Sequence, residues 1–137
     1  QSGSAKVYTA PTLPILSYDT GIAPTALHVS WIPDGGNPQS VTGIMLCTGG
    51  TPGGMGLAGG SLAPANIIIY GFPLFIAIDP INLLFTSNFG FDAFGNIVVI
   101  GASRSAPFLA GQFAFIQFYE TSPIPKSSNG IRMLLAP

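Results

Sequence analysis

Short apolar segments, separated by glycine and proline, run along the whole chain, and the most regular of them lies near residue 115. Between residues 113 and 119, bulky side chains occupy both the odd and the even positions. Successive side chains of a strand point to opposite faces, so this pattern predicts a central strand that is covered on both faces. The dipeptide Asn129-Gly130 tolerates positive φ and predicts a turn, which a last strand at residues 131–135 would follow.

Several other segments also have strand patterns. At residues 26–32, Leu27, Val29 and Trp31 alternate with two polar residues, which is typical of a half-buried strand. Residues 41–48 are apolar on both faces and predict another covered strand. Shorter strands are expected at residues 67–70, 74–78, 83–87 and 96–100. The glycine-rich stretch at residues 49–61 is expected to be a flexible loop or a closely packed turn, since the lysine and helix of a phosphate-binding loop do not follow it.

No apolar period of 3.6 residues persists over ten or more positions, so essentially no helix is expected. A chain of 137 residues suits one domain. About nine or ten short strands with glycine and proline turns predict an all-β, single-domain antiparallel β-sandwich of jelly-roll-like form. A sheet closed on itself is the alternative arrangement.

The first 17 residues differ from the rest in their prolines. Pro11 and Pro14 cannot donate to a β-ladder and stiffen an extended chain. We therefore expect residues 1–17 to form an extended arm that reaches a neighbouring subunit, and residues 18–137 to form the sandwich. The alternative is an ordinary first strand that lies along its own sheet. The expected subunit-interface residues of the arm are Val7, Tyr8, Leu13, Ile15 and Leu16.

Charged residues make up only 7% of the chain, with four Lys or Arg and five Asp or Glu. Soluble domains typically have about 25%. With a net charge near −1 there is little repulsion between copies, so we expect the surface to be covered by further copies of the chain. A monomer with a surface of Ser, Thr and Gly is the alternative. The chain has no basic patch, which argues against a nucleic-acid partner.

The sequence offers no catalytic constellation. His28 is the only histidine, and no serine lies in a G-x-S-x-G context. Runs of the D-x-D type that bind calcium are also missing. Cys47 is the only cysteine and has apolar neighbours, which favours a buried structural thiol. We therefore expect no enzyme activity, no metal and no cofactor.

A series of motifs occurs in one order in the second half of the chain. The motifs are Gly71-Phe72-Pro73-Leu74, Asp92-Ala93-Phe94-Gly95, Leu109-Ala110-Gly111, Phe115-Ile116-Gln117 and Ser128-Asn129-Gly130-Ile131. The chain is similar to the small all-β domain of secreted proteins of planctomycetes and related bacteria, and this resemblance implies export and a β-sandwich, with no catalytic residues. The final loop departs from the pattern, because Pro123 and Pro125 stand where the resembling domains tend to be longer and glycine-rich.

We expect the chain to be located outside the cell or at its surface. A first residue Gln1 fits a mature chain from which a signal peptide has been removed. No run of about 18 apolar residues is present, so a membrane-spanning helix is not expected.

These observations predict a secreted structural protein, a self-associating subunit of an extracellular filament, sheath or surface layer. The alternative is a secreted carbohydrate-binding or adhesion module that binds a cell-surface glycan. Such modules stack exposed aromatic side chains on sugar rings. The residues available for stacking are Tyr8, Tyr18, Trp31, Tyr70 and Tyr119.

Overall fold

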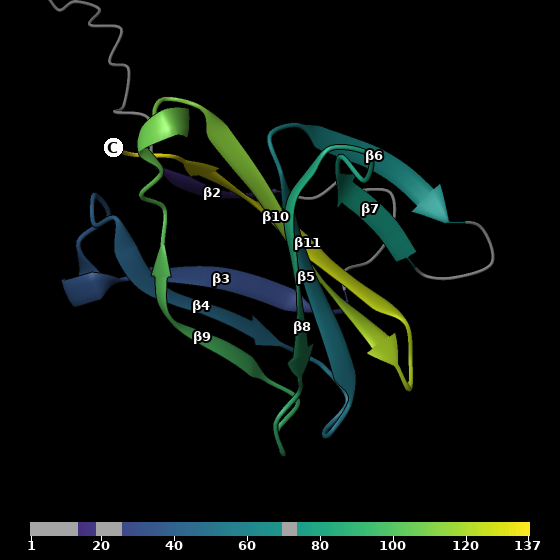
Figure 1. The fold of residues 1–137 in the computed structure, drawn as a ribbon. Helices are drawn as coiled ribbons and strands as arrows, with labels where there is room; N and C mark the ends of the chain where they lie inside the picture. Colours follow the sequence, from purple (N-terminus) through teal and green to yellow (C-terminus); the bar gives the residue numbers. More distant parts are fainter. Residues whose placement is uncertain (1–13, 19–25, 70–73) are drawn as a thin grey trace, which may run out of the picture.

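The computed structural model describes residues 14–18, 26–69 and 74–137, and these residues form an all-β domain (Figure 1). The predicted antiparallel fold with about nine or ten strands and essentially no helix is confirmed, and the two helical segments, η1 (Asp34–Gly36) and η2 (Pro107–Leu109), are single 3-10 turns. The strands are β2 (Ile15–Tyr18), β3 (His28–Pro33), β4 (Thr42–Thr48), β5 (Met55–Ser61), β6 (Pro64–Ile69), β7 (Leu74–Ile78), β8 (Leu83–Gly90), β9 (Ile97–Ser103), β10 (Phe113–Ser122) and β11 (Lys126–Leu134).

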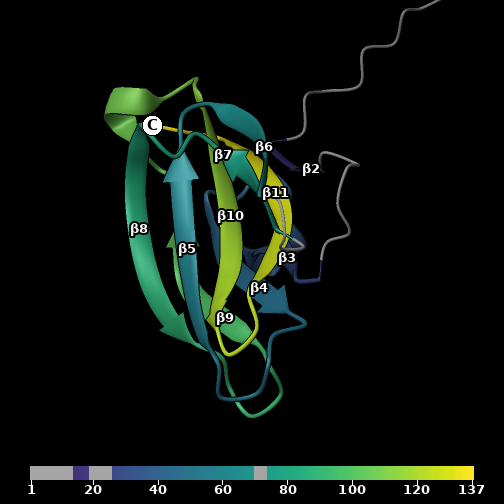
Figure 2. The same cartoon turned by 90° about the vertical axis from the view of Figure 1, so that its right-hand side faces the viewer.

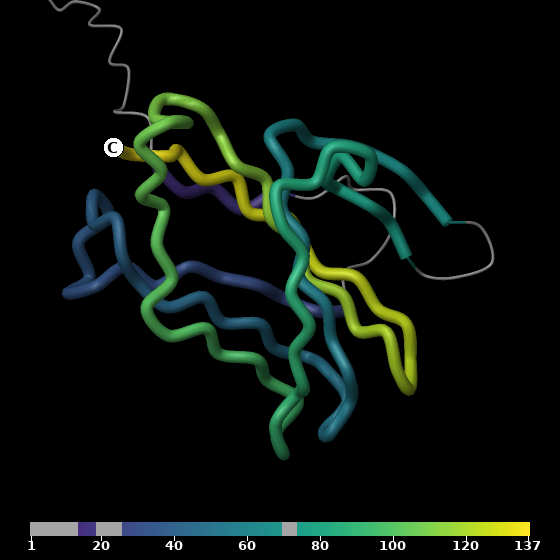
Figure 3. Tube along the Cα trace, viewed as in Figure 1, coloured from purple at the N-terminus to yellow at the C-terminus, as the bar shows by residue number. Residues whose placement is uncertain are grey.

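The strands form three layers. A five-stranded sheet of order β2-β11-β10-β5-β8 lies in the middle, and a three-stranded sheet of order β3-β4-β9 packs on one of its faces. The hairpin β6-β7 lies over the other face, against β10 and β11 (Figures 1 and 2). Strand β2, from the start of the described chain, lies beside the C-terminal strand β11 (Figure 3).

The main core fills the space between the two larger sheets. As the alternation at residues 26–32 predicts, Leu27 and Val29 are buried and His28 is exposed. Cys47 is fully buried, as expected, and burial raises the pKa of its thiol to about 12, so it carries no charge at neutral pH. The buried apolar residues of this core are Leu27, Val29, Met45, Cys47, Ala58, Phe91, Ile97, Ala114, Ile116, Phe118, Ile131, Met133 and Leu135.

Strand β10 is the central strand that its sequence predicts. It pairs with β11 on one side and with β5 on the other. Ile116 and Phe118 point into the main core, whereas Gln117 points to the hairpin β6-β7 and is also fully buried. Both faces of β10 are therefore covered.

The expectation of a loop at residues 49–61 is wrong for its second half, since Met55–Ser61 is strand β5, between β10 and β8. The glycines are needed for close packing. A Cβ at Gly56 would lie 2.9 Å from both Ile97 and Phe91, and one at Gly60 would lie 2.3 Å from the ring of Phe85. Bulky side chains of neighbouring strands occupy the space that side chains of β5 would need.

The predicted turn at Asn129-Gly130 is also wrong. Strand β11 begins at Lys126, and both residues lie inside it, where Gly130 pairs with Gln117. A bulge sets Ser128 and Asn129 opposite Phe118 alone, and the N–H of Phe118 donates to Ser128 Oγ at 2.9 Å. Ser128 thus accepts a hydrogen bond from the backbone inside the sheet, and the chain turns before Lys126.

Replacing Gly56 by Val is expected to lower the free energy of unfolding by about 1–3 kcal/mol, because Phe91 and Ile97 are both buried and cannot move aside freely. Gly90→Val is the matched control, since no heavy atom lies within 4 Å of a Cβ at Gly90. Urea denaturation of the three proteins measures the difference. Equal stability of both variants would show that the glycines of β5 have no packing role.

Candidate interaction surfaces

The structure divides the expected subunit-interface residues into two groups. Ile15 and Leu16 lie in β2, where they pair with Met133 and Arg132 of β11 in the same chain. The strand thus extends the sandwich of its own chain, which is the alternative considered for this segment. The remaining expected interface residues, Val7, Tyr8 and Leu13, lie outside the described residues.

Gln117 joins the hairpin β6-β7 to the five-stranded sheet. The N–H of Ala77 donates to Gln117 Oε1 at 2.7 Å, and Gln117 Nε2 donates to the carbonyl oxygen of Phe75 at 3.1 Å. Tyr18 and Ser127 bind the same edge of β7, through bonds of 2.7 Å to the Ala77 carbonyl and 3.2 Å from the Phe75 N–H. Side chains thus occupy the edge of β7 that faces the sheet. This glutamine therefore has a structural role.

Asn129 joins the two larger sheets in the same way. The N–H of Val29 donates to Asn129 Oδ1 at 2.8 Å, and Asn129 Nδ2 donates to the Val29 carbonyl at 3.0 Å. Nδ2 also donates to Ser17 Oγ at 2.8 Å, and the N–H of Leu27 donates to the Ser127 carbonyl at 3.3 Å. Strand β3 is therefore fastened to β11, and the sandwich is closed on this side.

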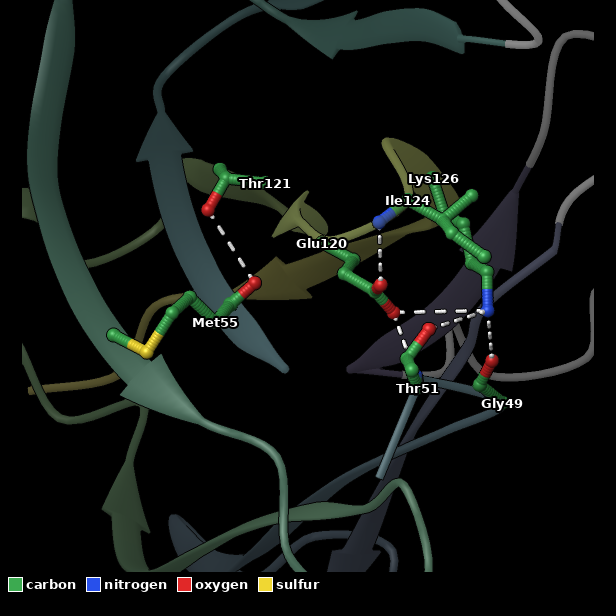
Figure 4. Close-up of polar contacts among 7 residues, drawn as sticks. All are labelled: Gly49, Thr51, Met55, Glu120, Thr121, Ile124 and Lys126. Atoms are coloured by element: carbon green, nitrogen blue, oxygen red, sulfur yellow. Dashed lines mark hydrogen bonds and ion pairs between the residues drawn. The ribbon is translucent and has the colours of Figure 1, made fainter. Parts of the chain in front are cut away.

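The buried carboxylate of Glu120 anchors the turn between β10 and β11 (Figure 4). Its oxygens accept hydrogen bonds from the N–H groups of Thr51, at 2.7 Å, and Ile124, at 3.2 Å, and Lys126 Nζ lies 3.6 Å from Oε1. Burial raises the pKa of this carboxyl group, but the hydrogen bonds from Thr51 and Ile124 and the charge of Lys126 outweigh burial and hold the pKa below its usual value. Lys126 also donates to the Gly49 carbonyl at 3.1 Å.

Arg104 is the other buried charged side chain among the described residues. Its guanidinium donates to the carbonyl oxygens of Gln39, Ser40 and Leu134. His28 is exposed on the outer side of β3. Within the described ranges, no three side chains of His, Cys, Asp or Glu are grouped so that they could hold a metal ion. The two buried charged side chains, Glu120 and Arg104, thus bind mainly backbone groups.

The aromatic residues considered for sugar stacking are turned inward where the structure describes them. Trp31 packs against the main core and its indole N–H is buried. The hydroxyl groups of Tyr18 and Tyr119 are bonded to the Ala77 carbonyl and to Gln117 Oε1. Tyr8 and Tyr70 lie outside the described residues. The described residues therefore offer no stacking platform from this set.

Among the described residues, the outer side of the three-stranded sheet has a group of aliphatic side chains beside His28 and Ser30. Strand β4 is apolar on both faces, as its sequence predicts, but among the described residues only the face with Met45 and Cys47 is packed. On the other face, Ile44 pairs with Ile32, and Leu46 pairs with Ser30 and Val98. Ile100 extends this surface and is 82% exposed. We call Ile32, Ile44, Leu46, Val98 and Ile100 the aliphatic face.

A groove lies on the side of the sandwich opposite to Asn129. Strands β8 and β9 are the outer strands of their sheets, and no described strand pairs with their free edges. Both edges lie on the same side of the molecule (Figures 1 and 2). A cavity of about 400 Å³ lies elsewhere, under the hairpin β6-β7, and is lined mainly by aliphatic side chains. The cavity between β8 and β9 has a volume of about 290 Å³ and is lined in part by Trp31, Met45, Leu84, Phe85, Val99 and Leu109, and we call it the β8–β9 groove.

Comparisons of the chain with protein families, characterised proteins and solved structures found no match. Among the described residues, no helix has the length and apolar character needed to cross a membrane. The assignment of a function therefore depends on the surfaces themselves.

Replacing Glu120 by Gln is expected to weaken the pH dependence of the free energy of unfolding. Because the folded-state pKa of Glu120 is lowered, its stabilising contribution is complete above the unfolded value near 4.5 and is lost as the pH falls through the lower folded value. The wild-type free energy of unfolding should therefore fall more than that of the variant between about pH 7 and about pH 3. Urea denaturation at several pH values measures the free energy of unfolding of both proteins.

The amide of the variant also has only one acceptor oxygen for the two N–H groups of Thr51 and Ile124, so a loss of about 1–3 kcal/mol is expected at neutral pH. Thr121→Val is the control in the same cluster, because Thr121 donates to the Met55 carbonyl but does not titrate in this range. Identical pH profiles of wild type and Glu120→Gln would contradict the role of the carboxylate.

Proposed function

We propose that the protein is a secreted structural subunit that self-associates into an extracellular filament, sheath or surface layer. The observation that carries this proposal is the aliphatic face, on which Ile100, Val98 and Ile32 are each at least 46% exposed. Contiguous exposed apolar surface of this kind marks interaction sites in folded proteins.

The energetics favour a contact between copies of the chain. Complete burial of one exposed Val, Leu or Ile side chain stabilises by about 1.5–3 kcal/mol. On the aliphatic face, Ile32, Val98 and Ile100 are exposed, whereas Ile44 and Leu46 are already half-buried. Charge repulsion between copies is weak, because the net charge is −1. An ordinary soluble domain has many charged residues on its surface. This chain has few, so more of its surface is available for contacts between copies.

The arrangement of the surfaces supports an extended assembly. The aliphatic face lies on the outside of the three-stranded sheet, and the β8–β9 groove lies between the two sheets at one edge. Two different surfaces that bind different parts of the neighbouring copies make heterologous contacts, and heterologous contacts that do not close produce filaments. The resemblance to an exported domain supports a location outside the cell.

Electron microscopy of the purified protein, together with its mass by light scattering, tests the proposal. Regular fibres or sheets, with a mass far above the 14.1 kDa of one chain, are expected. A monomer at all concentrations would overturn the proposal, and binding of glycans by that monomer would favour the adhesion module.

Replacing Ile100 by Lys is expected to raise the concentration needed for assembly about tenfold to a hundredfold, since a charge replaces an aliphatic side chain at the contact. Ile81→Lys is the matched control, because Ile81 is 87% exposed but does not belong to the aliphatic face. Sedimentation at a series of concentrations gives the two midpoints. Equal midpoints would show that the aliphatic face is not a contact surface.

A further inference from the structure

We infer that the β8–β9 groove accepts residues 7–12 of a second copy of the chain, which add a strand to the free edge of β8. This inference rests on the proposed self-association and specifies one of its contacts. It assigns the acceptor to one copy and the donor to the next.

The two sides of the sandwich differ in a way that defines the acceptor. On one side, Asn129 and the Leu27–Ser127 hydrogen bond connect β3 to β11, so the core is closed there. On the other side, the turn at residues 91–96 links β8 to β9 at one end, but no strand pairing in the described chain joins the two strands along their length. Core residues such as Met45 line the groove from inside, and Leu84 and Phe85 at its rim are 44% and 41% exposed. The groove therefore leads from solvent into the main core.

Strand β8 has the more regular of the two free edges. Its residues from Phe85 to Gly90 pair with β5 without interruption. Strand β9 contains Gly101 at φ 72°, and its pairing with β4 is irregular between Gly43 and Met45. A strand whose backbone is regular over six residues is the better template for an added strand.

The lining of the groove fits an apolar strand with free backbone groups. None of the residues that line it is charged. Trp31 is among them, and its indole N–H is buried without an acceptor in the described part of the chain. A buried donor without a partner is costly, so it favours a bound partner that supplies an acceptor.

The sequence of residues 1–13 matches this groove in chemistry and length. Lys6 is the only charged residue of the segment, and Val7, Tyr8, Ala10 and Leu13 are apolar or aromatic. Six extended residues span about 20 Å, the length of the regular part of β8. The described chain begins at Pro14, so thirteen residues precede it.

The prolines select which backbone groups would pair with β8. In a strand, the N–H groups of alternate residues point to the same side. Pro11 has no N–H and could not donate to β8, so the backbone groups of the odd-numbered residues must point away from β8. Tyr8, Ala10 and Thr12 would then form the hydrogen bonds with the edge.

The positions of donor and acceptor favour a neighbouring copy. The segment joins the sandwich at β2, the first strand of the five-stranded sheet, whereas β8 is the last. Four strand spacings, or about 19 Å, separate them. Each copy thus has its donor at one edge and its acceptor at the opposite edge, and donation from copy to copy continues without closing.

Proline variants of the full chain test the register. Ala10→Pro removes an N–H that is expected to bind β8 and should raise the concentration needed for assembly about tenfold. Thr9→Pro, on the same side as Pro11, should assemble as the wild type does. Equal behaviour of the two variants overturns the inference.

Two variants of β8 test the acceptor. Leu84→Lys places a charge at the groove, whereas Leu83→Lys changes the neighbouring residue, which is 42% exposed and does not line the groove. Assembly should be lost only in the first. Wild-type assembly of Leu84→Lys would overturn the assignment of the groove.

A mixing experiment separates donation to a neighbour from insertion into the same chain. Ala10→Pro keeps an intact groove, and Leu84→Lys keeps an intact N-terminal segment. With Ile100→Lys added to both, so that the aliphatic face is disabled, the mixture should form dimers of about 28 kDa, twice the mass of the chain. If only monomers form, the contact between copies is excluded.

The fluorescence of Trp31, the only tryptophan, reports on the groove itself, whereas sedimentation reports on the mass of the assembly. At equal protein concentration, iodide should quench Trp31 more strongly in Ala10→Pro than in Thr9→Pro, because the groove is occupied in fewer copies of the first. If Ile100→Lys raises the concentration needed for assembly while both proline variants assemble as the wild type does and are quenched alike, the proposed function stands and the groove inference fails. If the wild type is a monomer, the proposed function fails.

Discussion

Two buried side-chain amides hold the three layers of this domain together. Gln117 binds the N–H of Ala77 and the carbonyl of Phe75 as a neighbouring strand would, and Asn129 does the same for the N–H and carbonyl of Val29. A backbone group left without a partner in such an environment costs about 1–3 kcal/mol, so these bonds fix where the hairpin β6-β7 and strand β3 can lie. Because Asn129 closes only one side of the sandwich, the opposite side depends on whatever contacts the free edges of β8 and β9.

The fold class and the central strand could be predicted from the sequence, because bulky residues at both odd and even positions of β10 indicate a strand that is covered on both faces. Strand β5 and the start of β11 could not be predicted in this way. Glycine favours loops in local terms, and only the positions of Phe85, Phe91 and Ile97 explain why strand β5 needs glycine. The local preference of Asn129 likewise predicts a turn, whereas its partner Val29 is 100 residues away in the chain. The aliphatic face could be predicted in part from the two apolar faces of residues 41–48, but the groove depends on which strands end the sheets.

Several residues of the motifs in the second half of the chain have structural roles. Gln117 and Asn129 join layers, and Ser128 accepts the N–H of Phe118 at the bulge. Asp92 accepts the N–H groups of Phe94 and Asn96 and so fixes the turn before β9. These residues fix the architecture of the domain, whereas other side chains form its outer surfaces.

The aliphatic face and the β8–β9 groove would make different contributions to one assembly. Apolar burial at the aliphatic face is strong but has no direction, so by itself it allows several relative positions of two sheets. Backbone hydrogen bonds along β8 are directional, and the missing N–H of Pro11 allows only one alignment of the alternating residues. Neither contact depends on charged side chains, so both keep their strength when salt screens electrostatic interactions. A chain with nine charged residues can in this way combine a stable contact with a defined register.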